Sequence, residues 1–152
     1  MSLRERLSAA MKDAMRAREA DRLSAIRLIT AAIKDKDIAI RGEGGEVPAS
    51  DADLMAVLAR MVKQRQDSAK IYEEGGRADL AARELAEVRV IEEFLPKPLS
   101  AAETAAAIRA AIAATGATSI RDMGRVMAAL RAEHAGRMDF GAAGPLVRAA
   151  LG

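Results

Sequence analysis

The sequence contains no cysteine and no tryptophan, and it has only one histidine, one tyrosine and two phenylalanines in 152 residues. Without cysteine the chain can form no disulfide, thiol nucleophile or cysteine-based metal site. Its first residues, MSLRER, are charged and lack the apolar segment of a secretory signal peptide. A membrane-spanning helix needs about 20 apolar residues, whereas the closest run, residues 104–115, is short and contains Arg109. We therefore expect a cytoplasmic protein that does not enter a membrane.

Residues suited to catalysis are equally scarce. A hydrolase or transferase needs a nucleophile, a base and an electrostatic stabiliser in one pocket, but the single histidine, His134, falls at the end of a short predicted helix, where the helix dipole favours it. The glycines of residues 42–45 are not followed by the Lys-Ser/Thr pair of a phosphate-binding loop. We expect no catalytic residue, no metal site and no cofactor.

The residues that are abundant favour helices. Apolar residues make up 51% of the chain, and aromatic residues only 2%. Most of the apolar residues are aliphatic, and Ala, Leu and Met, together with Arg, Glu and Lys, are good helix formers. No alternating strand pattern of any length occurs. These features predict an all-α protein.

Capping residues and glycines place the helices. Ser2 with Glu5 and Ser100 with Glu103 form capping boxes. Apolar residues at helical spacing, among them Met15, Ile71 and Leu146, are expected to face inward. We predict helices over about 3–15, 22–41, 51–74 and 79–94, followed by shorter helices that begin after Ser100, after Ser119 and at Pro145. Residues 136–144 are predicted to be a loop.

The clearest boundary is the segment LPKPL at residues 95–99. One proline on each side of Lys97 forces an extended backbone. We therefore predict a four-helix N-terminal lobe over residues 1–96 and a smaller helical C-terminal lobe over residues 97–152.

Positive charge is concentrated in the predicted small lobe. Residues 97–152 hold seven Lys and Arg against four acids, a formal net charge of +3, whereas the rest of the chain sums to −1. Arginine suits phosphate recognition, and Arg121 and Arg125 are one helical turn apart with Gly124 between them. A solvated helix surface would also carry such arginines. The candidate nucleic-acid-binding residues are Lys97, Arg121, Gly124, Arg125, Arg131 and Arg137.

Several segments resemble the YqeY-like family, in the right order over nearly the whole chain. They are residues 22–34, 63–68 (KQRQDS), 75–81 (GGRADLA), 92–100 (EEFLPKPLS) and 122–127 (DMGRVM). The family is similar to the tail domain of the B subunit of the glutamine-dependent tRNA amidotransferase. That subunit converts Glu or Asp mischarged on tRNA to the amide, and its tail helps to grip the tRNA. The resemblance implies an N-terminal helical bundle, a smaller C-terminal helical lobe, and binding of tRNA or a related structured RNA without catalysis of amidation.

Two other functions stay open at this point. The chain could be an enzyme, a carbon–nitrogen ligase of the amidotransferase type, or an accessory to one, although it lacks the domain that handles ATP and ammonia. It could instead be a protein-interaction module that docks on an aminoacyl-tRNA synthetase, an amidotransferase or the translation machinery. If the small lobe does not bind RNA, the next candidates are Lys63, Arg65 and Arg77 of the larger lobe.

Overall fold

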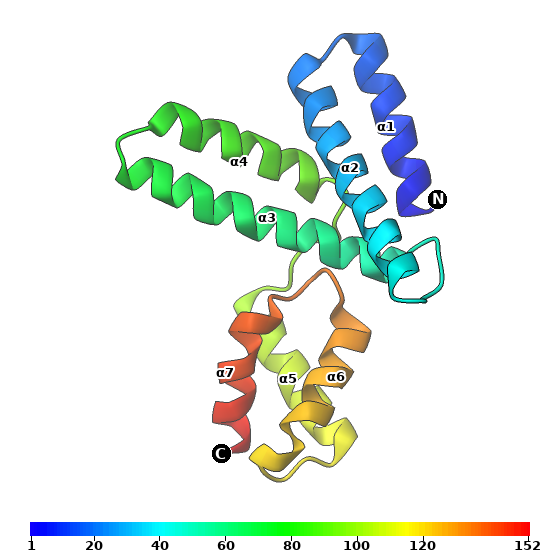
Figure 1. Cartoon of the computed structure of the whole chain (residues 1–152). Helices are drawn as coiled ribbons and strands as arrows, with labels where there is room; N and C mark the ends of the chain where they lie inside the picture. Colours follow the sequence, from blue (N-terminus) through cyan, green and yellow to red (C-terminus); the bar gives the residue numbers. More distant parts are fainter. The chain divides into compact units, whose positions relative to one another are not determined.

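The computed structural model describes all residues, Met1–Gly152, and is entirely helical, as the sequence predicts (Figure 1). The chain divides into two compact units, Met1–Pro96 (unit 1) and Lys97–Gly152 (unit 2). None of the helices is long and apolar enough to cross a membrane.

Unit 1 consists of two helical hairpins. Its helices are α1 (Leu3–Ala17), α2 (Ala20–Gly42), α3 (Asp51–Glu74) and α4 (Ala78–Glu92). The pair α3–α4 packs most extensively, and α2 packs against α1, α3 and α4. The core that these helices share contains buried aliphatic side chains from all four, including Leu7, Ile26, Ile29, Leu58 and Ile91. Figure 1 shows the far end of the α3–α4 hairpin extending away from α1 and α2.

Capping determines where these helices begin. The side chains of Ser2 and Ser50 each accept a hydrogen bond from the amide three residues on, and the carboxylates of Glu5 and Asp53 in turn accept one from the capping residue's own amide. Two backbone donors are thereby satisfied at each start. The turn between α3 and α4 is made at Gly76, whose φ of +74° is accessible mainly to glycine.

An ion pair closes the segment between α2 and α3. Arg4 on α1 donates to both carboxylate oxygens of Asp37 on α2, at 3.1 and 2.8 Å, and the Ala49 amide donates to the same carboxylate at 2.8 Å. The Arg4 hydrogen bond, followed by that of Ala49, lowers the pKa of Asp37 below its ordinary value. The return of the chain into α3 is therefore fixed by charge-assisted hydrogen bonds.

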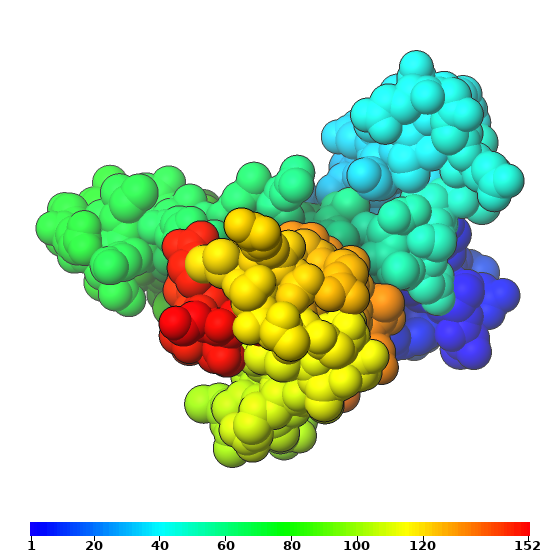
Figure 2. Space-filling model, turned by 90° about the horizontal axis from the view of Figure 1, so that it is seen from below, coloured from blue at the N-terminus to red at the C-terminus, as the bar shows by residue number.

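Unit 2 is a three-helix unit with one short 3₁₀ turn. Its elements are α5 (Ala101–Thr115), η1 (Ile120–Asp122), α6 (Met123–His134) and α7 (Phe140–Leu151). The three α-helices pack pairwise against one another around Ile108, Val126, Leu130 and Val147. Figure 2 shows the end of this unit at which the α5–α6 connection lies beside α7.

The predicted loop over residues 136–144 is wrong in its second half. Helix α7 begins at Phe140, because the Asp139 side chain accepts hydrogen bonds from the amides of Gly141 and Ala142 at 2.9 and 3.3 Å. Pro145 therefore lies inside the helix and not in its first turn. The helix tolerates it because the carbonyl that loses its partner belongs to Gly141, which is exposed and can bond to water.

Three apolar side chains expected inside are exposed: Met15 by 54%, Ile71 by 67% and Leu146 by 52%. Ile71 lies near the free end of the α3–α4 hairpin, where two helices bury only one face of each and the small Ala69 and Ala81 occupy the contact. On α7, Ala143 and Val147 face the core, and Leu146 points about 100° away from Val147.

Candidate nucleic-acid interface

The turn into α6 holds two of the predicted phosphate-binding residues, Arg121 and Arg125. Asp122 organises this turn, because its carboxylate accepts from the amides of Thr118 and Ser119 at 2.9 and 3.3 Å. It also accepts from Arg125 Nη2 at 2.6 Å. The Thr118 hydrogen bond, followed by that of Arg125, lowers the pKa of Asp122 from 3.8 to about 2.

Arg125 is anchored while it stays accessible. Its Nη1 donates to the Thr115 carbonyl at the end of α5, at 2.9 Å, while Nη2 binds Asp122. The side chain is still 60% exposed. The fixed guanidinium presents its outer side to solvent, and its charge is partly balanced by the Asp122 carboxylate.

Arg121 and Gly124 form the open part of this surface. Arg121 is exposed and has no acidic partner within ion-pair distance. A Cβ built on Gly124 would meet no atom within 4 Å. A ligand backbone can therefore come close to the first turn of α6 at Gly124, next to an unpaired cation.

Arg131 lies on a different face of α6. It is six residues after Arg125, so the two side chains are about 120° apart around the helix axis. The Arg131 guanidinium lies 5.7 Å from the ring centroid of Phe140 at the start of α7, a cation–π arrangement that holds it at the surface.

Lys97 and Arg137 meet at the start of unit 2. Arg137 Nε donates to the Lys97 carbonyl at 2.9 Å, and the Leu99 amide donates to the Arg137 carbonyl at 2.9 Å. Arg137 is half-buried, whereas Lys97 is exposed. Arg137 thus fastens the chain that enters α5, and Lys97 is the free cation of the pair.

Glu103, the acid in the capping box of α5, lies near Lys97 and Arg137. Hydrogen bonds from the Ser100 amide and hydroxyl are the main cause of the lowered pKa of Glu103, and the charges of Arg137 and Lys97 add to them. The structure therefore places Arg121, Gly124 and Arg125 together and Lys97 with Arg137, while Arg131 stands apart from Arg125 on α6.

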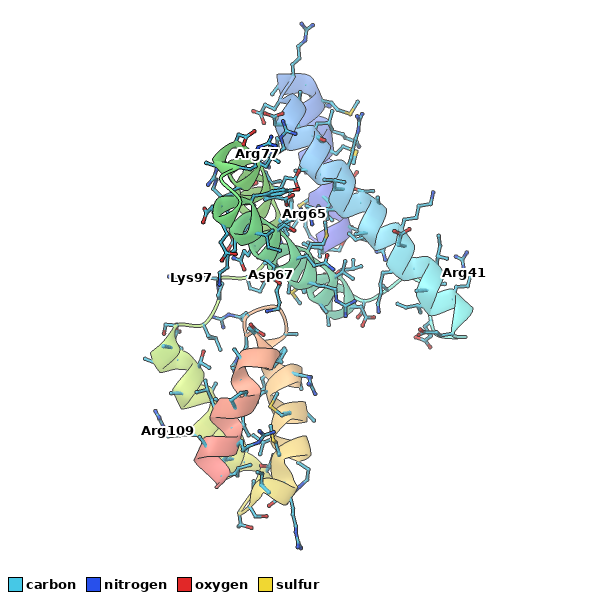
Figure 3. All side chains as sticks on the ribbon, turned by 60° about the vertical axis from the view of Figure 1, so that its left-hand side comes forward. Arg41, Arg65, Asp67, Arg77, Lys97 and Arg109 are labelled. Atoms are coloured by element: carbon cyan, nitrogen blue, oxygen red, sulfur yellow. The ribbon has the colours of Figure 1, made fainter.

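Two exposed cations of unit 2 lie outside the predicted set. Arg109 is on the outer surface of α5, where Figure 3 shows its side chain pointing away from α6 and α7, and Arg148 is on α7. The sequence shows them as members of the basic lobe, but no motif distinguishes them from solubilising residues.

Two of the three unit 1 cations named as the next candidates form ion pairs. Arg65 Nε binds Glu87 of α4 at 2.8 Å, with only 17% of the Arg65 side chain exposed. Arg77 binds Asp79 at 3.2 Å. Lys63 is exposed and forms no ion pair. Figure 3 shows Arg65 midway along α3 and Arg77 at the turn to α4.

Nothing in the structure assembles around His134. Its Nδ1 is buried without a hydrogen-bond partner, and its Nε2 is 3.7 Å from the carboxylate of Glu133. The best-formed hollows are shallow, belong to unit 1 and do not include this residue. No three acidic or histidine side chains converge in a way that could hold a metal ion.

Curated relatives cover part of the chain. Over 85 residues, 56% of this chain, it is 32% identical to "Altered inheritance of mitochondria protein 41, mitochondrial" of Saccharomyces cerevisiae strain YJM789 and of strain ATCC 204508 / S288c. It is 35% identical over 85 residues to the protein of the same name from Clavispora lusitaniae. The match spans under half of each relative's length, 44% for the Saccharomyces proteins and 46% for the Clavispora protein.

These relatives correct one prediction. A cytoplasmic location was expected, but the matched relatives are named as mitochondrial proteins, so that expectation is wrong. The lack of cysteine and of a long apolar run does not distinguish the cytoplasm from the mitochondrion.

A family model covers almost the full length. The model described as "Yqey-like protein" matches residues 4–151, which include both units and every cation discussed above. This agrees with the resemblance seen in the sequence segments. The chain therefore belongs to the Yqey-like protein family.

Proposed function

We propose that the chain is a non-catalytic RNA-binding module that grips tRNA, or a similarly structured RNA, through phosphates placed against unit 2. One observation carries the proposal. Unit 2 has a formal net charge of +3, and three of the cations predicted to bind phosphate, Lys97, Arg121 and Arg131, are exposed without an acidic partner. The resemblance to an amidotransferase tail, which helps to grip tRNA, supports the same ligand.

The binding mode follows from the aromatic residues. Single-stranded RNA recognition usually stacks bases on exposed aromatic rings. Here Phe94 is buried, Tyr72 is half-buried, and the Phe140 ring lies under Arg131. No ring is free to stack, so the contacts fall on phosphates and on the shape of a folded RNA, with little sequence preference.

The residues have different tasks in this proposal. Arg121 and Lys97 contact phosphates directly, and Arg131 does so from its position over Phe140. Arg125 contributes a fixed but partly neutralised guanidinium, and Gly124 leaves room for the RNA backbone. Arg137 holds the segment that carries Lys97 and has two Nη groups left as donors.

A filter-binding assay with total tRNA at low salt tests the proposal. The double reversal Arg121→Glu with Arg125→Glu should weaken binding by at least tenfold, and the loss should shrink as salt is raised. The matched control is Arg83→Glu with Arg89→Glu, which makes the same charge change at two exposed positions of α4.

Circular dichroism must show that both variants stay helical. This control is needed because Arg125 also holds the turn into α6. Equal losses in the two variants would mean that only net charge matters, and unchanged binding in the first would remove this surface from the site.

A further inference from the structure

One surface of unit 1 has no part in the proposed RNA contact. Helix α2 turns Ile26, Ile29 and Ile33 into the core. On the opposite side, five exposed residues follow one another at spacings of four, three, four and three, within about 80° of the helix circumference. We name this surface the α2 stripe; it consists of Arg27, Ala31, Lys34, Ile38 and Arg41. Figure 3 labels Arg41 at the end of α2.

The charges of the stripe are all positive and unpaired. None of Arg27, Lys34 and Arg41 forms an ion pair. Two acids flank the stripe: Asp35, which is exposed, and Asp37, which is half-buried, is bound by Arg4 and also feels the charge of Arg41. The exposed face of α3 differs, because Arg60, Lys63 and Lys70 alternate there with Asp67 and Glu74. The stripe is therefore a one-sign surface on a chain whose other unit 1 helices mix their charges.

Apolar side chains lie between these cations. Ile38 is 56% exposed between Lys34 and Arg41, Ala31 separates Arg27 from Lys34, and Leu28 borders the stripe with 42% of its surface exposed. Exposed aliphatic groups contribute nothing to a phosphate contact, and α2 has no aromatic residue on which a base could stack. The alternation fits a ligand that has both charge and apolar surface.

The spacing identifies the shape of that ligand. Cations seven residues apart are about 10.5 Å apart along α2, and the four–three repeat is that of the seam between two packed helices. A helix with carboxylates every seven residues and aliphatic residues between them would meet both components along about 21 Å. A second copy of α2 would place cations against cations, which opposes self-association through this surface.

We propose that the α2 stripe is a docking surface for an acidic amphipathic helix of a partner protein. Carboxylates of that helix pair with Arg27, Lys34 and Arg41, and its aliphatic side chains cover Ala31 and Ile38. The proposal is independent of the RNA contact of unit 2.

The test uses the full chain and two synthetic 21-residue peptides with fluorescent labels. The acidic peptide carries Glu at the first and Leu at the fourth position of each heptad, with Ala and Gln elsewhere, and the basic peptide has Lys in place of each Glu. Fluorescence anisotropy should show saturable binding of the acidic peptide alone.

Charge exchange then locates the surface. The variant Arg27→Glu, Lys34→Glu, Arg41→Glu should bind the acidic peptide at least tenfold more weakly than the wild-type chain, and it should bind the basic peptide. The matched variant Arg60→Glu, Lys63→Glu, Lys70→Glu should keep the acidic peptide within about twofold, and Ile38→Ser should weaken it about threefold or more, because covering an exposed aliphatic group stabilises the complex.

Three results would overturn the proposal. One is failure of the acidic peptide to bind the wild-type chain, and another is an equal loss in both triple variants. The third is loss of tRNA binding in the α2 triple variant together with unchanged binding of the acidic peptide to Ile38→Ser. That result would make the stripe an RNA surface. Helical circular dichroism establishes that each variant is folded.

Discussion

Truncation of the Leu130 side chain tests whether the two compact units fold independently of each other. Their independent folding is a prediction. Leu130 is 1% exposed, at the centre of the unit 2 core. Replacing a buried leucine by alanine costs about 2–5 kcal/mol of folding free energy. Unit 2 comprises residues Lys97–Gly152, and at about 0.05–0.15 kcal/mol per residue its stability is about 3–8 kcal/mol. Leu130→Ala should therefore remove a large part of it.

Hydrogen exchange followed by mass spectrometry measures the effect in each unit. In Leu130→Ala, amides of α5, α6 and α7 should lose about 2–5 kcal/mol of protection, while those of α1–α4 should change by less than about 0.5 kcal/mol. Ile29→Ala, at a fully buried position of unit 1, should give the reverse pattern. Equal loss of protection in both units, for either variant, would show one cooperative structure and refute the division.

Three further predictions concern single residues of unit 2. Gly124→Ala should stabilise the fold by up to about 1 kcal/mol and so raise the melting temperature, because nothing lies within 4 Å of the new methyl group. The same variant should weaken tRNA binding if the RNA backbone approaches there. A lower melting temperature would contradict the open geometry. Because the pKa of Asp122 is lowered from 3.8 to about 2, its carboxylate stabilises the fold above about pH 4 and this contribution is lost as the pH falls towards 2. The difference in melting temperature between wild type and Asp122→Asn should therefore be present at pH 7 and vanish near pH 2, and a difference that does not depend on pH would count against the hydrogen bonds described for Asp122. His134→Ala should stay helical and keep its tRNA affinity within about twofold, since no group assembles around the imidazole; a loss of tenfold in the folded variant would give His134 a functional role.

Local signals in the sequence predict most of the fold. The capping boxes at Ser2 and Ser100 and the N-cap at Ser50 begin helices where expected, because a side-chain oxygen at that position satisfies first-turn amides in any context. Helix α7 was missed in part because the glycines and alanines of residues 136–144 have no periodic apolar pattern. The signal that could have found its start was Asp139, a residue suited to capping.

Tertiary contacts decide what the local pattern leaves open. Ile71 fits a helical apolar stripe, yet no element of unit 1 covers it, since α3 and α4 bury only one face of each other there. The candidate site shows the same limit. Lys97 and Arg121 are exposed. The pairing of Arg125 with Asp122 follows helix spacing, but Arg125 and Arg137 also donate to the backbone carbonyls of Thr115 and Lys97, which are distant in sequence and which no spacing rule predicts.

The salt dependence of tRNA binding by the wild-type chain tests the RNA proposal most directly. Four contacts, from Lys97, Arg121, Arg125 and Arg131, predict that the logarithm of the binding constant falls linearly with the logarithm of salt concentration, with a slope of about −3 to −4. The slope should be the same for different tRNAs, because phosphates and shape are the groups contacted. No binding at about 50 mM salt, or binding with a slope near zero, would contradict recognition through the phosphates of an RNA.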